Sequence, residues 1–208
     1  MPGRTVSDFP LFPLGMVALP GEVVPLHIFD PRYRTMISDC LEQEREFGIV
    51  WASDDDVRAV GCAVAITEVL ETQPDGRMNI LTQGTRPFRV VEERHDLPYP
   101  AATVEWLRDD AEDPSEPVAL AAREVYRDLV EQATDNEPDP AELAAMTAYE
   151  MAATVDFGAD AKQGLLDLRS ENARLTLVTR LLRAALKRLD FIERAQARAR
   201  SNGKVHFG

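Results

Sequence analysis

Long apolar runs, cysteine and histidine are all scarce in this chain of 208 residues. No uncharged apolar run reaches the roughly 18 to 20 residues that a membrane-spanning helix requires, so we expect no membrane association. The opening MPGRTVSDFPLF lacks the cationic start and apolar core of a secretory signal, so we expect a cytoplasmic protein. The chain is long enough to bury about 70% of its unfolded surface without a metal or a disulfide.

The two cysteines and three histidines restrict the kinds of site that the chain can form. Cys40 and Cys62 are too few for a disulfide framework and lack the spacing of a zinc pair, so both are predicted to be buried free thiols. A zinc site needs three or four ligands, whereas His27, His95 and His206 lie far apart in the sequence. We therefore expect neither a metal nor any other cofactor.

One histidine has a carboxylate close by in the sequence. His27 lies in PLHIFD, three residues before Asp30, so an imidazole and a carboxylate could meet where a loop enters a helix. The alternative, which we favour, is that the imidazole hydrogen-bonds the start of that helix or backbone nearby.

The net charge of −13 argues against the uniform basic face that nucleic-acid binding requires. From Arg169 to the end there are 10 basic and 3 acidic residues, a balance of +7; the preceding residues hold 13 (23 − 10) basic and 33 (36 − 3) acidic ones, a balance of −20. We expect the basic end to face the acidic remainder of the same molecule rather than an acidic partner.

Hydrophobic periodicity divides the chain into a β-rich part, 1–110, and a helical part, 111–208, so the predicted class is α+β. In the first part, Asp30 and Pro31 are typical of a helix start, and a helix is predicted over 31–44. Strands are expected over 47–52, 61–72, 77–84, 86–93 and 102–107, with a turn at Gln73-Pro74-Asp75-Gly76. Several short strands of this kind favour a closed or nearly closed barrel.

In the second part, helices are predicted over 117–133, from Asp139 to about 155, over 160–168 and over 171–199, with Gly158 ending the second of them. Arg174 and Arg180 are expected outside the apolar stripe of the last helix. The acidic runs at 54–56 and 109–116 are predicted to be solvated loops.

Four segments, taken together in order and spacing, carry a resemblance to a known family. They are FPLFPLGMVALPGEVVPLHIFDPRYRTMI at 9–37, FGIVW at 47–51, VGCAVAITEVLETQPDGRMNILTQGTRPFRVV at 60–91 and YPAATVEWL at 99–107. This pattern resembles the amino-terminal substrate-binding domain of Lon proteases, the peptidase S16 family. The resemblance implies a PUA-like pseudo-barrel with one embedded helix, followed by a helical bundle that ends in a long helix. The domain is also similar to one in the substrate receptor cereblon.

In Lon proteases this region helps to select unfolded or tagged polypeptides, and the resemblance implies the same class of partner here. The sequence contains no GxxxxGK[ST] phosphate loop and no GxSxG elbow, and no segment resembles the serine–lysine protease domain of Lon. We therefore expect a stand-alone, non-catalytic module that acts as an adaptor or holdase in protein quality control. We expect this module to pass the bound polypeptide to a separate protease or chaperone.

Recognition of an unfolded polypeptide requires exposed apolar and aromatic side chains. Candidates in the best-matched segment are Met16, His27, Phe29, Arg32, Tyr33 and Met36. Arg32 is the residue expected to hold a peptide carboxylate or carbonyl. The alternative for Phe29, Tyr33 and Met36 is that they form the packing face of the helix.

A different class of function also stays open, a cereblon-like domain with a small ligand in a pocket walled by Trp51, Trp106 or Tyr99.

Overall fold

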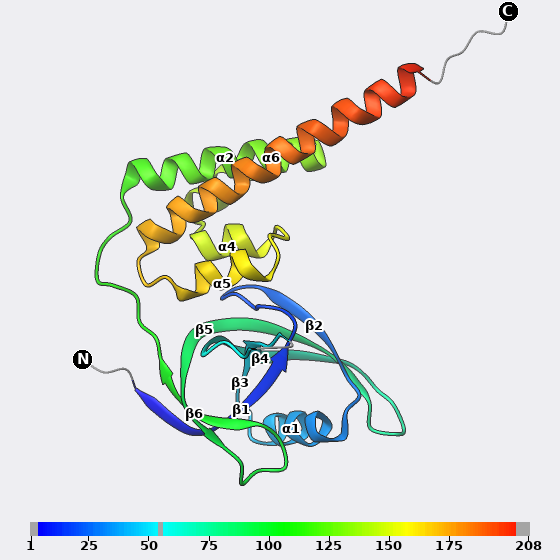
Figure 1. Cartoon of the computed structure of the whole chain (residues 1–208), viewed down its shortest axis with the longest axis vertical. Helices are drawn as coiled ribbons and strands as arrows, with labels where there is room; N and C mark the ends of the chain where they lie inside the picture. The colour runs from blue at the N-terminus through cyan, green and yellow to red at the C-terminus, as the bar shows by residue number, and fades with distance from the viewer. Residues whose placement is uncertain (1–3, 54–55, 203–208) are drawn as a thin grey trace, which may run out of the picture.

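The β-rich part closes into a small barrel (Figure 1). The computed structural model describes residues 4–53 and 56–202. Its strands are β1 (Thr5–Leu14), β2 (Val23–Ile28), β3 (Phe47–Trp51), β4 (Val60–Thr72), β5 (Met78–Arg94) and β6 (Ala101–Trp106). Their order is β2-β5-β4-β3-β1-β6, and a further pairing of β5 with β6 closes the ring. β1 and β3 are parallel, whereas the other neighbours are antiparallel. The predicted closed barrel is confirmed, with β2 left outside the ring.

The two strongest local signals in this half form as predicted. Helix α1 (Pro31–Glu42) begins after Asp30, whose side chain accepts a hydrogen bond from the backbone N–H of Arg32. The turn between β4 and β5 places Gly76 at a φ of 84°, a left-handed conformation that favours glycine. Figure 1 shows α1 beside the barrel at the end away from the other helices.

A single long strand, β5, replaces the two strands that were predicted over 77–84 and 86–93. Gly84, the last residue of the strand predicted over 77–84, lies inside this strand. Its N–H donates to the Glu22 carbonyl, and its own carbonyl accepts from the Gly21 N–H, both at 2.9 Å. A Cβ at Gly84 would lie 2.0 Å from the backbone oxygen of Leu19. The glycine therefore permits a close approach between two backbones instead of ending a strand.

This contact predicts a large effect of a single methyl group. Gly84→Ala should lower the free energy of unfolding by about 2 kcal/mol or more, because either β5 or the backbone at Leu19 must move. Gly15→Ala is the matched control, since nothing lies within 4 Å of a Cβ there. Urea unfolding of both variants checks this, and equal stabilities would contradict the close approach.

The second half is helical, as predicted, with two differences. Its helices are α2 (Glu116–Thr134), α3 (Pro140–Ala145), α4 (Ala148–Ala153), α5 (Ala159–Asp167) and α6 (Glu171–Asn202). The predicted helix from Asp139 to about 155 is in fact two helices, because Thr147 and Glu150 form a capping box that starts α4. Gly158 does not end a helix but precedes α5.

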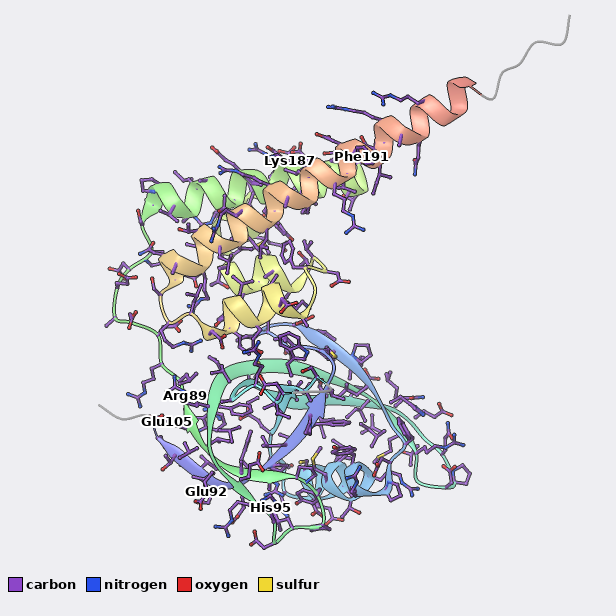
Figure 2. The ribbon with its side chains drawn as sticks, viewed as in Figure 1. Arg89, Glu92, His95, Glu105, Lys187 and Phe191 are labelled. Atoms are coloured by element: carbon purple, nitrogen blue, oxygen red, sulfur yellow. The ribbon has the colours of Figure 1, made fainter. Side chains whose placement is uncertain are left out.

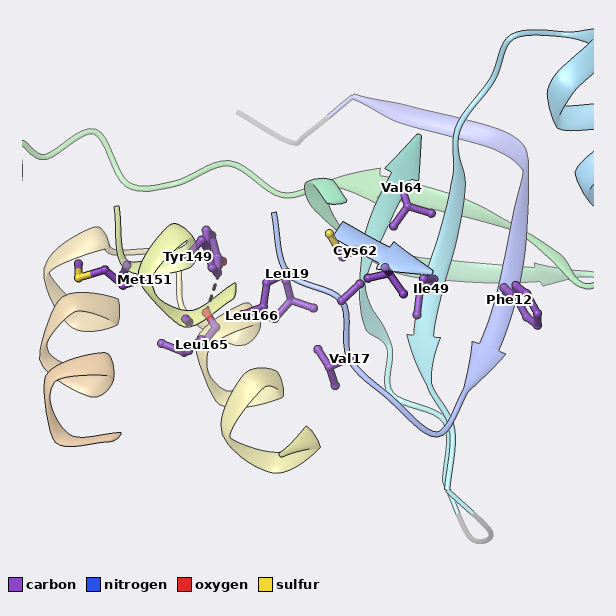
Figure 3. Packing of buried hydrophobic residues seen from close by; sticks show 14 of the residues in the cluster. Phe12, Val17, Leu19, Ile49, Cys62, Val64, Tyr149, Met151, Leu165 and Leu166 are labelled. Atoms are coloured by element: carbon purple, nitrogen blue, oxygen red, sulfur yellow. Dashed lines mark hydrogen bonds between the residues drawn. The ribbon is translucent and has the colours of Figure 1, made fainter. Parts of the chain in front are cut away.

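One hydrophobic core joins the barrel to the helices. Leu19, from the segment between β1 and β2, is fully buried in the same cluster as Leu165 and Leu166 of α5 and Met151 of α4 (Figure 3). In Figure 1, α4 and α5 lie between the barrel and the pair formed by α2 and α6, and α6 extends beyond the end of α2. The ranges 1–110 and 111–208 therefore share buried apolar contacts.

Arg174 of α6 lies inside the molecule, contrary to the prediction that it would lie outside the apolar stripe. Its side chain is 2% exposed. Its Nε donates to Glu171 at 2.8 Å, its Nη1 donates to Asp109 at 2.9 Å, and its guanidinium lies 4.4 Å from the ring centroid of Tyr149. Burial opposes the charge, but the hydrogen bonds that Arg174 donates to the two carboxylates, together with the Tyr149 contact, raise the pKa of Arg174. Asp109, predicted to lie in a solvated loop, is thus a fixed partner of α6.

Loss of this cation should destabilise the helical half. Arg174→Met removes the cation that Glu171 and Asp109 share, so Glu171 keeps only the Ala148 N–H and Asp109 the more distant Arg169. This should lower the free energy of unfolding by about 2 to 4 kcal/mol. Arg180→Met removes an exposed arginine from the same helix and should change it by about 0.5 kcal/mol or less. Chemical denaturation of both variants tests this, and a neutral effect of Arg174→Met would show that the buried ion pairs contribute little.

The acidic run at 54–56 was predicted to be a solvated loop, and its first two residues lie outside the described residues, as does His206.

Candidate functional site

An exposed apolar surface lies where β2 leads into α1, next to the strand β4. We call it the β2 surface and define it by Pro25, His27, Phe29 and Leu70. Phe29 is 66% exposed and Leu70 is 52% exposed. Pro25, His27 and Leu70 line a shallow hollow of about 410 Å³. Large apolar side chains exposed beside a hollow of this kind are typical of binding surfaces rather than of a sealed core.

The alternating pattern of β2 produces this surface. Val24 and Ile28 point into the core, so Pro25 and His27 face outward between them. The His27 ring stacks on Phe29 with 5.9 Å between ring centroids. The imidazole Nδ1 lies 2.6 Å from Oδ1 of Asn79 on β5. The possible pair with Asp30 does not form, nor does the imidazole bond the helix start, because the cross-strand register places Asn79 directly opposite His27.

β2 is an edge strand with a proline in it. Among the described strands it pairs only with β5, so its other edge has no strand partner. Pro25 pairs with Leu81 in the ladder, yet it has no N–H to donate. A proline tolerated in a paired edge strand turns its nitrogen outward, which removes a donor from the free edge. The surface therefore offers side chains to a partner and is poorly suited to adding a further strand.

Arg32 and Tyr33 follow at the start of α1. Arg32 donates from Nε and Nη2 to the carboxylate of Asp30, at 3.2 and 2.9 Å. These side-chain hydrogen bonds lower the pKa of Asp30. Tyr33 is half-buried, and its ring stacks on Phe12 with 4.1 Å between centroids. Arg32 thus has a fixed orientation at the surface, whereas Tyr33 is largely a packing residue.

The two methionine candidates do not lie on the surface in the same way. Met36 is 0% exposed and belongs to the core, so the alternative interpretation as a packing residue fits it, and we do not retain it as a contact residue. Met16 is half-buried and packs against the same core. The structure therefore places His27, Phe29 and Arg32 at the surface, whereas Met36 is buried. Leu70 was missed because only the pairing of β4 with β5 and of β5 with β2 brings it there.

A second, larger cavity has a volume of about 540 Å³ and includes one predicted site residue, Arg32. Buried apolar residues from β1, β3 and β6 contribute to its walls, and Arg58, Arg94 and His95 also line it. Tyr99 lines this cavity, but Trp51 and Trp106 do not. Trp51 lies under Arg58 and Trp106 under Arg86. The three aromatic rings named as possible pocket walls thus lie in different places.

The described residues contain no group of three or more His, Cys, Asp or Glu side chains that could hold a metal ion. Cys40 and Cys62 are buried free thiols, as predicted. No described helix is both long and apolar enough to cross a membrane.

Comparison with known proteins identifies the family. Residues 8–184 match the family model described as the ATP-dependent protease La (LON) substrate-binding domain. The chain belongs to this family. The closed barrel, the embedded helix and the helical bundle are therefore the architecture of a Lon substrate-binding domain.

Individual relatives agree with this assignment. The chain is 23% identical to a Lon protease of Flavobacterium johnsoniae over 93% of its length, and 27% identical to Lon protease 2 of Myxococcus xanthus over 83% of its length. It spans only 26% and 23% of those two proteins, respectively. A solved Lon N-terminal domain protein from Xanthomonas campestris is similar, with a TM-score of 0.64 and 26% identity over 82% of this chain and 96% of that one. The N-terminal domain of a Mycobacterium avium complex Lon protease shares the fold, with a TM-score of 0.61 and 16% identity over 86% of this chain and 98% of that one.

The two thiols should be unreactive in the folded Lon domain. Burial raises the pKa of Cys40 to about 11 and that of Cys62 to about 12. At pH 8 each should carry at least about 100-fold less thiolate than an ordinary thiol, so a disulfide reagent should modify the folded chain correspondingly slowly. The control is the chain unfolded in guanidinium, in which both thiols should react and release two equivalents of the reagent's coloured thiolate. Rapid modification of the folded chain would contradict the burial of both thiols.

Proposed function

We propose that this Lon substrate-binding domain binds exposed segments of unfolded polypeptide through the β2 surface, without catalysing a reaction on them. The observation that carries the proposal is the exposed aromatic ring of Phe29, stacked on His27 near the hollow that Leu70 lines. Exposed aromatic side chains next to a shallow hollow provide the apolar anchors that peptide recognition needs.

The character of the surface favours transient binding of many sequences. It is small, and its apolar side chains lie beside His27, Asn79 and Glu71, which line the same hollow. These three polar side chains are hydrogen-bonded to one another, so much of their hydrogen-bonding capacity is already used within the surface. With its donor missing at Pro25, the free edge of β2 limits strand addition, which reduces the risk that bound clients seed aggregation. We therefore propose an adaptor or holdase role in protein quality control, in which the client passes to a separate protease or chaperone.

The family supports this proposal only through the description of its model. The model that matches residues 8–184 is named for substrate binding, and relatives that are called Lon protease contain a region similar to this chain. The present chain spans about a quarter of the length of those relatives. The activity of the whole relatives is not needed for the binding proposed here.

Fluorescence anisotropy of a labelled, permanently unfolded protein, titrated with this chain without nucleotide, tests the proposal. Phe29→Ala should weaken binding by about fivefold to tenfold, because it removes a large apolar anchor. Leu120→Ala is the matched control, since Leu120 on α2 is also exposed, at 48%, but lies in the helical half. Its affinity should equal that of the wild type.

Circular dichroism of each variant must first show an unchanged fold. Absence of saturable binding at tens of micromolar wild-type chain, a range in which weak recognition is still measurable, would refute the proposal. Equal losses in Phe29→Ala and Leu120→Ala would place the binding surface elsewhere.

A further inference from the structure

A cavity with apolar walls and three arginines includes Arg32, which follows Phe29 of the β2 surface by three residues. Its volume of about 540 Å³ is within the range of small-molecule sites. Leu11, Val50 and Ala101 are buried residues that contribute apolar walls. Such a cavity has room for an apolar side chain together with the backbone that carries it.

The charged residues that line the cavity are mostly of one sign. Arg32, Arg58 and Arg94 all line it, together with His95, whereas Glu93 is its one lining carboxylate. This excess is notable in a chain whose net charge is −13. A site that combines apolar walls with several guanidinium groups is complementary to an apolar group that carries a negative charge.

Two of the arginines have fixed orientations with donors to spare. Arg32 uses Nε and Nη2 to bind Asp30, and Arg94 uses the same two nitrogens to bind Asp96, at 3.2 and 3.1 Å. Arg94 also lies 3.6 Å from Asp8, and Arg58 lies 3.8 Å from Asp56, so each of the three arginines has a carboxylate partner. None of these four aspartates lines the cavity. A guanidinium has five N–H donors, so Nη1 of each arginine keeps hydrogens that can bind a further oxygen.

The wall of the cavity is also held in place before any ligand arrives. The Tyr99 hydroxyl donates to Asp39 at 2.9 Å and accepts from Arg45 at 2.8 Å. The Leu11 N–H donates to the Pro100 carbonyl at 2.8 Å, which ties the β5–β6 connection to β1. Preformed walls reduce the ordering cost of binding.

We infer that this cavity binds the last residue of a client polypeptide, with its apolar side chain inside and its free α-carboxylate on the arginines. The inference rests on the proposed function and names the part of the client that is recognised. Arg32 is three residues from Phe29, so chain length alone keeps their backbones within about 11 Å. A client whose carboxyl terminus occupies the cavity therefore lies close enough to reach the β2 surface as well.

The test compares two forms of one short labelled peptide that ends in leucine, one with a free carboxylate and one with a carboxy-terminal amide. Anisotropy titrations should show that the free carboxylate binds the wild-type chain about tenfold more tightly. In the double variant Arg58→Gln and Arg94→Gln this preference should fall to about twofold or less.

Arg89→Gln is the control for the loss of one positive charge, half of the charge that the double variant removes. Arg89 is an exposed arginine on the same strand as Arg94 and does not line the cavity; Figure 2 shows it well apart from His95. This variant should keep the full preference for the carboxylate.

The possible failures of this inference and of the proposed function are distinguishable. If the unfolded protein binds but the two peptides bind equally, the cavity does not recognise a carboxyl terminus, and the β2 surface proposal stands. If the carboxylate peptide is preferred but the unfolded protein does not bind, general client binding is refuted and the cavity assignment is supported. An equal loss of preference in Arg89→Gln would also overturn the assignment, since it would show an effect of net charge alone.

Discussion

The short segment between β1 and β2 holds the barrel, the helices and the candidate surface together. Its backbone meets β5 at Gly84, where only a glycine leaves room for the Leu19 carbonyl. The Leu19 side chain then fills the core shared with α4 and α5. Next to it, Glu22 accepts hydrogen bonds from its own segment at Leu19 and from Lys162 of α5. Displacing this segment would disturb both halves of the molecule at once.

The same segment leads directly into β2, and this explains how an edge strand can carry an exposed apolar surface. β2 is anchored at one end by these contacts and at the other by α1, whose start is fixed by Asp30. It bonds to β5 along one side only. A rigid strand can present Phe29 and Pro25 to solvent without collapse, and the proline limits self-association through the free edge. Exposure and stability are thereby compatible in this part of the fold.

The features that follow from local sequence were predictable, whereas those set by distant contacts were not. The helix start at Asp30 and Pro31 and the turn at Gly76 depend on a few neighbouring residues, and both form as expected. The prediction of two strands in place of β5 was wrong because the role of Gly84 depends on Leu19, which is far away in sequence. The split between α3 and α4 has a local signal, Thr147 followed by Glu150, which hydrophobic periodicity does not reveal.

The candidate site shows the same division. Phe29 and Arg32 could be proposed from a segment of recognisable composition, but the neighbours of His27 come from β4 and β5. The arginines of the cavity come from α1, the β3–β4 connection and the end of β5, so no sequence window contains them. Arg174 has the spacing of a surface residue, and only the return of Asp109 and Tyr149 to α6 explains its burial.

Hydrogen–deuterium exchange of the whole chain, with and without an excess of a permanently unfolded protein, shows directly whether a client binds the β2 surface. Binding there should slow exchange in β2 and in the facing parts of β4 and β5, with no change in α2 and α6. Slower exchange confined to the helices, or no change anywhere at saturating client, would refute binding at the β2 surface.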